Sequence, residues 1–253
     1  MLSGDRGLVE TNLLGVRVHA SSFERAIGFV EQQVAARTAT FVVSANVYSV
    51  MLATEQPELH GCFEQAGMVY ADGMPIVWSL RTLGYPAERV HGDDLMLACC
   101  ERFPGWGHYL LGGRPGQPET VAHALTQRFP TIKIAGVHAT PERPPAPGEN
   151  ARILNEIVSS RADIVWVGMG TPLQDVWMQA NVTAVGLPML GVGSAFDLVS
   201  GRTRRAPDWI KRSGMQWAFR LGQEPRRLFR RYATYNPRFV ARIIPELQRR
   251  RRN

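Results

Sequence analysis

Asp72 is the carboxylate whose position in the sequence best suits a chemical role. It follows the apolar run 68–71 and precedes Gly73, so a strand ending at residue 71 would leave its side chain at the rim of a sheet. A carboxylate held there can act as a general base on a hydroxyl group. Asp72 can equally cap a helix that begins at Pro75, because these residue types are common at helix starts. The spacing leaves both interpretations open.

Three arginines near the C-terminus, Arg220, Arg227 and Arg230, are separated by seven and three residues. In a helix they would share one face, where guanidinium groups can clamp a diphosphate. The alternative is a basic face that only contacts solvent. Interleaved apolar and aromatic residues favour an interface instead, with lipid headgroups or single-stranded nucleic acid. These residues are Trp209, Trp217, Phe219, Leu228, Phe229, Tyr232 and Phe239.

Short apolar runs alternate with helical patterns along most of the chain. Strands are predicted at 41–46, 68–71, 108–111, 132–137, 163–167 and 187–192. Helices are predicted at 47–66, 95–102, 120–129 and 153–159. Strands that are apolar throughout and separated by helices predict an α/β fold, with a Rossmann-like, mostly parallel sheet and helices on both of its faces.

Polar and glycine residues follow these predicted strands, at the edge where open parallel sheets bind ligands. Glycines there let the backbone approach a ligand and leave N–H groups for phosphate, although any one pair can simply form a tight turn. Together they predict a nucleotide-type ligand. The residues are Ser44, Asn46, Asp72, Gly73, Gly112, Gly113, Gly168, Gly170, Gly191 and Gly193. Gln174 can hydrogen-bond a sugar or a base there, or cap a helix.

Positive charge is concentrated in the last fifth of the chain. Residues 202–253 contain 16 Lys/Arg and 3 Asp/Glu, and residues 1–201 contain 13 and 19. The two parts carry net charges of +13 and −6, which give the formal +7 of the whole chain. Such a field attracts phosphates on a nucleotide, a nucleic acid or an anionic membrane. We expect an α/β domain that holds the chemistry at 1–200 and a basic helical, membrane-associating appendage at 201–253.

The remaining polar clusters do not indicate a metal. Asp93 and Asp94 can hold a divalent cation, but capping of the next helix explains them better, and no Asp-x-Asp pair accompanies them. His91 is interpreted as a turn residue. The three cysteines have neither disulfide nor zinc spacing, and Cys99-Cys100 predicts core packing in mid-helix. We predict no metal and no cofactor.

The sequence contains no apolar run near the about 20 residues that a membrane-spanning helix needs. Its N-terminus lacks the apolar core of a secretory signal. With the cysteine pattern, these features predict a cytoplasmic location.

The order and spacing of several short motifs resemble the WecG/TagA/CpsF glycosyltransferases, glycosyltransferase family 26, of bacterial cell-surface polysaccharide synthesis. The resemblance covers about residues 42–232. Its motifs are Ser44-Ala45-Asn46, Ala71-Asp72-Gly73, Arg89-Val90-His91-Gly92-Asp93-Asp94-Leu95, Leu111-Gly112-Gly113-Arg114-Pro115-Gly116, Gly168-Met169-Gly170-Thr171-Pro172-Leu173-Gln174-Asp175, Gly191-Val192-Gly193-Ser194-Ala195-Phe196-Asp197, Arg205-Ala206-Pro207-Asp208-Trp209, Trp217-Ala218-Phe219-Arg220-Leu221 and Glu224-Pro225-Arg226-Arg227.

The resemblance implies transfer of a sugar from a UDP-sugar to a polyprenyl-diphosphate-linked acceptor, with inversion of the anomeric centre, by a peripheral protein on the inner face of the plasma membrane. Donors of the family carry N-acetylmannosamine, its uronic acid or glucose. The resemblance implies Asp72 as catalytic base and a C-terminal appendage that closes over the site and docks on the membrane. The implied diphosphate-binding residues are Arg220, Arg227 and Arg230. The candidate substrate-binding residues are Ser44, Asn46, Gly73, Asp94, Gly112, Gly113, Gly170, Gln174, Gly193 and Asp197.

Leu173, Asp175 and Gln216 depart from the family pattern around the sugar pocket, so the motifs leave the donor undecided. Two other functions stay open. A nucleic-acid-binding protein would use the basic tail but leaves Asp72 and the glycines unexplained, so we predict no nucleic-acid partner. A non-catalytic scaffold would bind a UDP-sugar without turnover. The sequence does not decide whether the protein forms a homo-oligomer.

Overall fold

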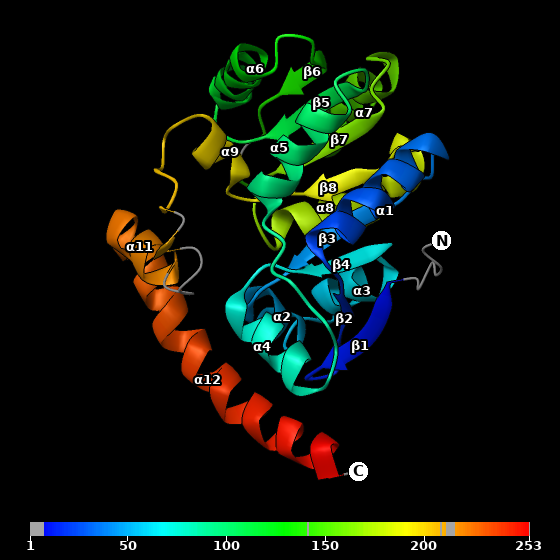
Figure 1. Ribbon diagram of the computed structural model, residues 1–253. Coiled ribbons are helices and arrows are strands. Elements are labelled where there is room, and N and C mark those ends of the chain that lie inside the picture. The colour runs from blue at the N-terminus through cyan, green and yellow to red at the C-terminus, as the bar shows by residue number, and fades with distance from the viewer. Residues whose placement is uncertain (1–7, 141, 208, 211–215, 253) are drawn as a thin grey trace, which may run out of the picture.

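The computed structural model describes residues 8–140, 142–207, 209–210 and 216–252 of the 253-residue chain, except for the side chain of Arg227. Its centre is an eight-stranded sheet in the order β1-β2-β4-β3-β8-β7-β5-β6 (Figure 1). β1 pairs antiparallel with β2, and all other neighbours pair parallel. The strands are β1 (Val9–Leu13), β2 (Val16–Ala20), β3 (Phe41–Ala45), β4 (Met68–Ala71), β5 (Gly107–Gly112), β6 (Lys133–His138), β7 (Ile164–Gly168) and β8 (Met189–Gly191). The predicted α/β fold with a mostly parallel sheet is confirmed.

Alternate residues of the central strands enter two cores, one on each face of the sheet. In β3, Phe41 and Val43 belong to one core and Val42 to the other. The first core is covered by α2 (Val47–Ala53), α3 (Pro57–Gln65), α4 (Met74–Thr82), α7 (Pro147–Ser159) and α8 (Leu173–Val185). The second is covered by α1 (Phe23–Ala35), α5 (Gly92–Arg102), α6 (Gln117–Arg128) and α9 (Ala195–Val199). Apolar runs were the right signal because these strands are buried on both faces.

The predicted helix 47–66 is divided into α2 and α3. Asn46 caps α2, and its side chain forms a reciprocal capping box with Ser49. Pro57 starts α3 because it lacks the N–H group that a continuous helix would need at that position, whereas the first turn does not need it. The division leaves Asn46 at the carboxyl end of β3, fixed by its own helix.

The sequence does not predict the N-terminal hairpin of β1 and β2. Its two-residue turn is Leu14-Gly15, with φ angles of 55° and 81°. Such turns usually contain Asn-Gly or Asp-Gly, because both residues need a positive φ. The turn here has leucine at its first position, so the sequence lacks the usual hairpin pattern. The N–H group of Leu14 donates a hydrogen bond to the Glu246 carboxylate, 232 residues away and 3.0 Å distant.

The C-terminal helices α11 (Gln216–Gln223) and α12 (Pro225–Arg252) lie along one side of the body (Figure 1). Leu228 is buried, and Phe239 and Ile243 are buried in the first core of the body. Further along α12, Arg238 pairs with Glu55, Arg242 donates to the Thr54 hydroxyl, and Arg250 donates to the Thr11 hydroxyl. None of the described helices is both long and apolar enough to cross a membrane. The domain boundary at residues 200 and 201 stays a prediction.

Phe239 allows the docking of α12 to be tested. Its side chain is 2% exposed, whereas Phe229 on the same helix is 66% exposed. We expect Phe239→Ala to lower the free energy of unfolding by about 3–5 kcal/mol and to speed hydrogen exchange in α12, because it leaves a cavity under the helix. Phe229→Ala is the matched control and should change neither. Equal losses from both variants in urea denaturation would show that this face does not hold α12.

Candidate active site

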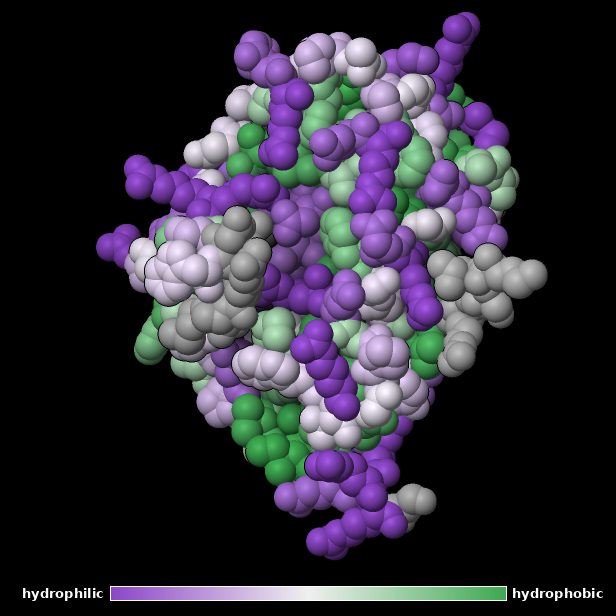
Figure 2. Space-filling model, in the orientation of Figure 1, coloured by the Kyte–Doolittle hydropathy of each residue, from purple (hydrophilic) through white to green (hydrophobic). Residues whose placement is uncertain are grey.

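Two adjacent cavities open at the carboxyl edge of the parallel strands, on a hollowed face with mostly hydrophilic walls (Figure 2). The first, which we call the Asp72 cavity, has a volume of about 190 Å³ and is enclosed by the body and the appendage together. Its walls include Asn46, Tyr48, Asp72, Gly73, Arg89, His91, Gln216, Trp217, Arg220, Arg231 and Tyr232. The second, which we call the glycine cavity, measures about 340 Å³. Its walls include Gly113, Arg114, Gly168, Gly170, Gly193, Ser194, Asp197 and Arg202.

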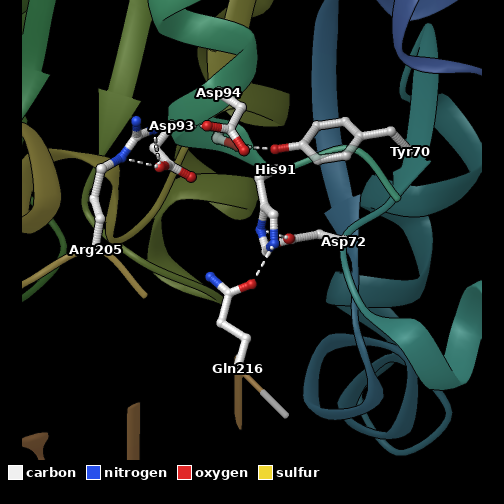
Figure 3. A network of polar contacts seen from close by, with 8 residues as sticks. Tyr70, Asp72, His91, Asp93, Asp94, Arg205 and Gln216 are labelled. Carbon is white, nitrogen blue, oxygen red and sulfur yellow. Dashed lines mark hydrogen bonds and ion pairs between the residues drawn. The ribbon is translucent and has the colours of Figure 1, made fainter. Parts of the chain in front are cut away.

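Asp72 lies directly after β4, and its backbone N–H group donates to the carbonyl of Ala45 in β3. The N-cap of α4 is Gly73, and no side chain caps that helix. The capping alternative for Asp72 is therefore not adopted. Its carboxylate instead lines the Asp72 cavity and forms an ion pair with His91, with 2.7 Å between Oδ1 and Nδ1 (Figure 3).

His91 lies between Asp72 and the appendage. Its Nε2 atom is 2.8 Å from Oε1 of Gln216, a residue of α11 (Figure 3). Burial lowers the pKa of the His91 ring, but the charge of Asp72 and its hydrogen bond outweigh burial, so the pKa is raised overall. His91, which the sequence analysis interpreted as a turn residue, is thus in direct contact with the candidate base.

Two arginines of the Asp72 cavity bring positive charge close to Asp72. Arg89 comes from the segment before α5, and burial lowers its pKa while the carboxylates of Asp72, Asp94 and Asp93 oppose that change. A guanidinium stays protonated under such conditions. Arg231 comes from α12, and its Cζ atom lies 3.6 Å from the centre of the Tyr48 ring. This cation–π contact joins the appendage to α2.

Asn46 connects the same two parts through its side-chain oxygen. Oδ1 accepts from the N–H group of Ser49 at 3.1 Å and from Nη2 of Arg231 at 3.1 Å. The first bond completes the cap of α2, and the second fixes the guanidinium over the cavity. Asn46 and Asp72 line the same cavity, at the carboxyl ends of the neighbouring strands β3 and β4.

Gln174 holds two glycines of the glycine cavity by hydrogen bonds to their backbone. It is buried, and its Oε1 atom accepts hydrogen bonds from the N–H groups of Gly170, at 3.0 Å, and Gly193, at 3.1 Å. These two N–H groups are consequently not available to a phosphate, in contrast to the expectation from the glycine pattern. Gln174 neither caps a helix through its side chain nor reaches the cavity wall in the described structure.

Charged side chains supply the polar wall of the glycine cavity. Arg202 pairs with Asp197 at 3.4 Å, and Arg114 pairs with Glu142 at 3.1 Å. Asp197 also accepts a hydrogen bond from Gln117 at 2.9 Å. These contacts leave two arginines at the rim, where an anionic ligand would meet them.

A close backbone contact lies between the walls of the two cavities. A Cβ atom on Gly92 would lie 3.1 Å from both Cα and the carbonyl oxygen of Val192, so a larger residue would push these segments slightly apart. His91 and Gly193, the neighbours of these residues in sequence, line the Asp72 cavity and the glycine cavity respectively. The walls of the two cavities therefore come together at this contact.

Several predicted site residues lie behind the cavity walls. Ser44 is buried in β3, and Gly112 packs so closely on Gly168 that a Cβ would lie 2.8 Å from its carbonyl carbon. Asp93 and Asp94 occupy the first turn of α5 instead of its cap, and Arg205 binds both, at 2.5 and 2.7 Å (Figure 3). Contact of Ser44, Asp94, Gly112 or Gln174 with a substrate stays a prediction.

The predicted arginine triad is divided in the structure. Arg220 lines the Asp72 cavity, whereas Arg230 is exposed in a shallow groove beside Phe229. The side chain of Arg227 lies outside the described residues. Sequence reasoning missed Arg89 and Arg231 as cavity residues. Arg231 follows Leu228 by three residues, and that helical spacing to a buried leucine was the available signal.

Among the described residues, no group of three His, Cys, Asp or Glu side chains gathers as metal ligands. Cys99 and Cys100 are fully buried in α5, which confirms the predicted core packing. Burial raises the pKa of the Cys99 thiol to about 12 and the pKa of the Cys100 thiol well above its ordinary value, so neither forms a reactive thiolate readily.

Comparison with known proteins identifies a match over most of the chain. The glycosyl transferase WecG/TagA/CpsF family matches residues 11–253. The N-acetylglucosaminyldiphosphoundecaprenol N-acetyl-beta-D-mannosaminyltransferase of Staphylococcus aureus strain MW2 is 29% identical over 195 residues, which cover 75% of this chain and 74% of the relative. Enzymes of the same name from strains NCTC 8325 / PS 47 and MRSA252 are 29% identical over 185 residues, with 71% and 70% coverage.

The double hydrogen bond of Gln174 can be tested by Gln174→Met, which keeps the length of the side chain but removes its oxygen. We expect the free energy of unfolding to fall by about 1–3 kcal/mol, because the N–H groups of Gly170 and Gly193 lose their acceptor. Gln127 is exposed on α6, so Gln127→Met is the matched control. Unchanged stability of Gln174→Met in urea denaturation would mean that water replaces the amide oxygen without cost.

Proposed function

Because the chain belongs to the glycosyl transferase WecG/TagA/CpsF family and is a glycosyltransferase, we propose that it moves a sugar of the N-acetylmannosamine type from a UDP-sugar to a polyprenyl-diphosphate-linked acceptor. The name of the staphylococcal relatives supports the sugar and the acceptor, since it describes transfer of N-acetylmannosamine to N-acetylglucosaminyldiphosphoundecaprenol. The observation that carries the proposal is the Asp72 carboxylate in a cavity shared with arginines of the body and the appendage.

We infer that Asp72 is the general base. It takes the proton of the acceptor hydroxyl while that oxygen bonds to the anomeric carbon of the donor. The bond between this carbon and the β-phosphate oxygen of UDP breaks, and UDP departs with the electron pair. Attack from the face opposite the leaving group inverts the anomeric centre. The position of the carboxylate on the wall of the Asp72 cavity supports this role.

Donor and acceptor carry diphosphates that need positive partners. We assign the UDP part to the glycine cavity, where Arg114 and Arg202 lie at the rim, and the acceptor diphosphate to the arginine side of the Asp72 cavity. Arg89, Arg220 and Arg231 can offset the negative charge there, and fixed cations stabilise charge that grows on the leaving phosphate. The contact of Gly92 with Val192 supports a donor that reaches from one cavity into the other.

Asp72→Asn tests the base. We expect turnover to fall by a factor of about 10²–10⁴ while UDP binding stays within about twofold, because the amide keeps the shape but accepts no proton. The assay follows labelled N-acetylmannosamine from its UDP form onto an N-acetylglucosaminyl diphospholipid, with UDP binding measured by calorimetry. Glu119→Gln, at an exposed site on α6, is the control. Turnover at the wild-type rate in Asp72→Asn would remove Asp72 from the mechanism.

We further propose that α11 and α12 bind the inner face of the plasma membrane. Their exposed apolar residues form a surface that we call the apolar patch, and they include Trp217, Phe229 and Val240, which are 48%, 66% and 50% exposed. Trp217, Phe229 and Val240 line one shallow groove, and apolar side chains gather over α12 in Figure 2. The exposed Arg226 and Arg230 flank Phe229. Apolar side chains beside arginines suit the boundary between headgroups and acyl chains.

Phe229→Asp combined with Val240→Asp tests this surface. Each change removes about 1.5–3 kcal/mol of apolar burial and adds like charge, so binding to phosphatidylglycerol vesicles should weaken more than about tenfold. Val158→Asp is the control, because Val158 is 61% exposed but lies on α7, away from the appendage. Wild-type vesicle binding by the double variant would contradict the proposal.

Oligonucleotide binding that depends steeply on salt and is unaffected by UDP would favour a nucleic-acid partner instead.

A further inference from the structure

Asp72, His91 and Gln216 form a chain of contacts from the body to the appendage. Oδ1 of Asp72 lies 2.7 Å from Nδ1 of His91, and Nε2 of the same ring lies 2.8 Å from Oε1 of Gln216 (Figure 3). The outer members are 144 residues apart in sequence, and each comes from a different element. The ring is 15% exposed, so the protein holds it from both ends.

Both contacts of the ring end on oxygen atoms, and an oxygen of a carboxylate or an amide accepts hydrogen bonds. Only the imidazolium form of histidine donates from both ring nitrogens. The arrangement of two oxygens around the ring suits the positively charged form of His91 when the appendage is docked. The surrounding charges are the carboxylates of Asp93 and Asp94 in α5 and the guanidinium groups of Arg89, Arg205, Arg220 and Arg231. Asp72 is the group in direct contact.

The ion pair selects one oxygen of Asp72 for chemistry. Oδ1 is buried, whereas the whole side chain is 23% exposed. The exposed part of the side chain therefore excludes Oδ1, which leaves Oδ2 as the candidate oxygen for a hydroxyl group in the cavity. A carboxylate held at one oxygen cannot rotate freely about its Cβ–Cγ bond, so the second oxygen keeps a fixed direction.

We propose that His91 is a positioning residue for Asp72 and that Gln216 is a positioning residue for His91, so that docking of α11 sets the geometry of the base. This inference rests on the proposed role of Asp72. It gives the appendage a task beyond covering the cavity, since removal of Gln216 releases the ring and, through the ring, the carboxylate. His91 does not touch the reacting atoms and is not itself a catalytic residue.

Two isosteric variants of His91 separate its two contacts. The amide nitrogen of asparagine falls near Nδ1 of histidine, so His91→Asn keeps a donor for Asp72 and loses the contact with Gln216. Glutamine places its amide nitrogen near Nε2, so His91→Gln keeps the contact with Gln216 and loses the contact with Asp72. We expect kcat to fall up to about 100-fold in His91→Gln, but by no more than about tenfold in His91→Asn and in Gln216→Ala. KM for the UDP-sugar should stay within about twofold in all three.

The controls are His123→Gln and Gln127→Ala, two exposed positions on α6, which should keep wild-type kcat. Equal kcat values for His91→Asn and His91→Gln, or a change in KM alone, would overturn the inference. If Asp72→Asn is inactive while His91→Gln matches the wild type, the proposed function stands and the positioning role fails. If Asp72→Asn keeps full turnover, the proposed function fails independently of His91.

A titration of the His91 ring by nuclear magnetic resonance tests the chain without an activity assay. In the wild type the pKa should lie above the ordinary value of about 6.5. In Asp72→Asn it should fall below that value, because burial and the charge of Arg89 then act without the carboxylate. A raised folded-state pKa stabilises the protein below pH 6.5, and this stabilisation is lost as the pH rises through the raised pKa. An unchanged ring pKa in Asp72→Asn would exclude the ion pair.

Discussion

Seven of the eight strands run in parallel, and this single constraint brings their carboxyl ends to one edge of the sheet. Asn46 ends β3 and Asp72 ends β4, and these strands are hydrogen-bonded neighbours. Gly193 follows β8, which pairs with β3 on its other side. Residues separated by almost 150 positions in sequence therefore border adjacent cavities. The chemistry of the site depends on strand direction before it depends on any individual side chain.

A shared edge leaves the cavity exposed to water on its outer side, and the C-terminal helices close that side. Phe239 and Ile243, with the partly buried Tyr235 and Leu247, supply the apolar contact of α12 with the first core. The polar partners are distributed along the same helix, from Arg231 on Asn46 to Glu246 on the backbone of Leu14. The basic tail is therefore more than an electrostatic attachment. Part of its charge is used to hold the wall of the cavity, and the exposed remainder is available for a surface.

The sequence predicts the fold well where burial is uniform and poorly where conformation depends on single residues. The strands from β3 to β8 could be predicted because apolar runs between helices have few alternatives. The β1–β2 hairpin could not, since Leu14 adopts a positive φ that its residue type does not indicate. The position of Asp72 beside Asn46 follows from the pairing of β3 with β4, a strand order that the sequence patterns did not predict. The pairing with His91 depends on how the segment before α5 returns to the sheet, and no local pattern encodes that path.

The arginines illustrate how helix phase determines which charges reach the site. The spacing of Arg220, Arg227 and Arg230 places them on one face only if a single helix continues through residue 225. Pro225 instead begins α12 after α11 ends at Gln223, so the angular relation between the two helices is set by the junction and not by residue count. Within α12, the buried residues Leu228, Phe239 and Ile243 define the inner face. Arg231 follows Leu228 by three positions and precedes Phe239 by eight, so it turns inward, whereas Arg230 is rotated by about 100° and remains exposed. A one-residue difference in helical position thus decides whether a guanidinium group stacks on Tyr48 beside the candidate base or faces the solvent with the apolar patch.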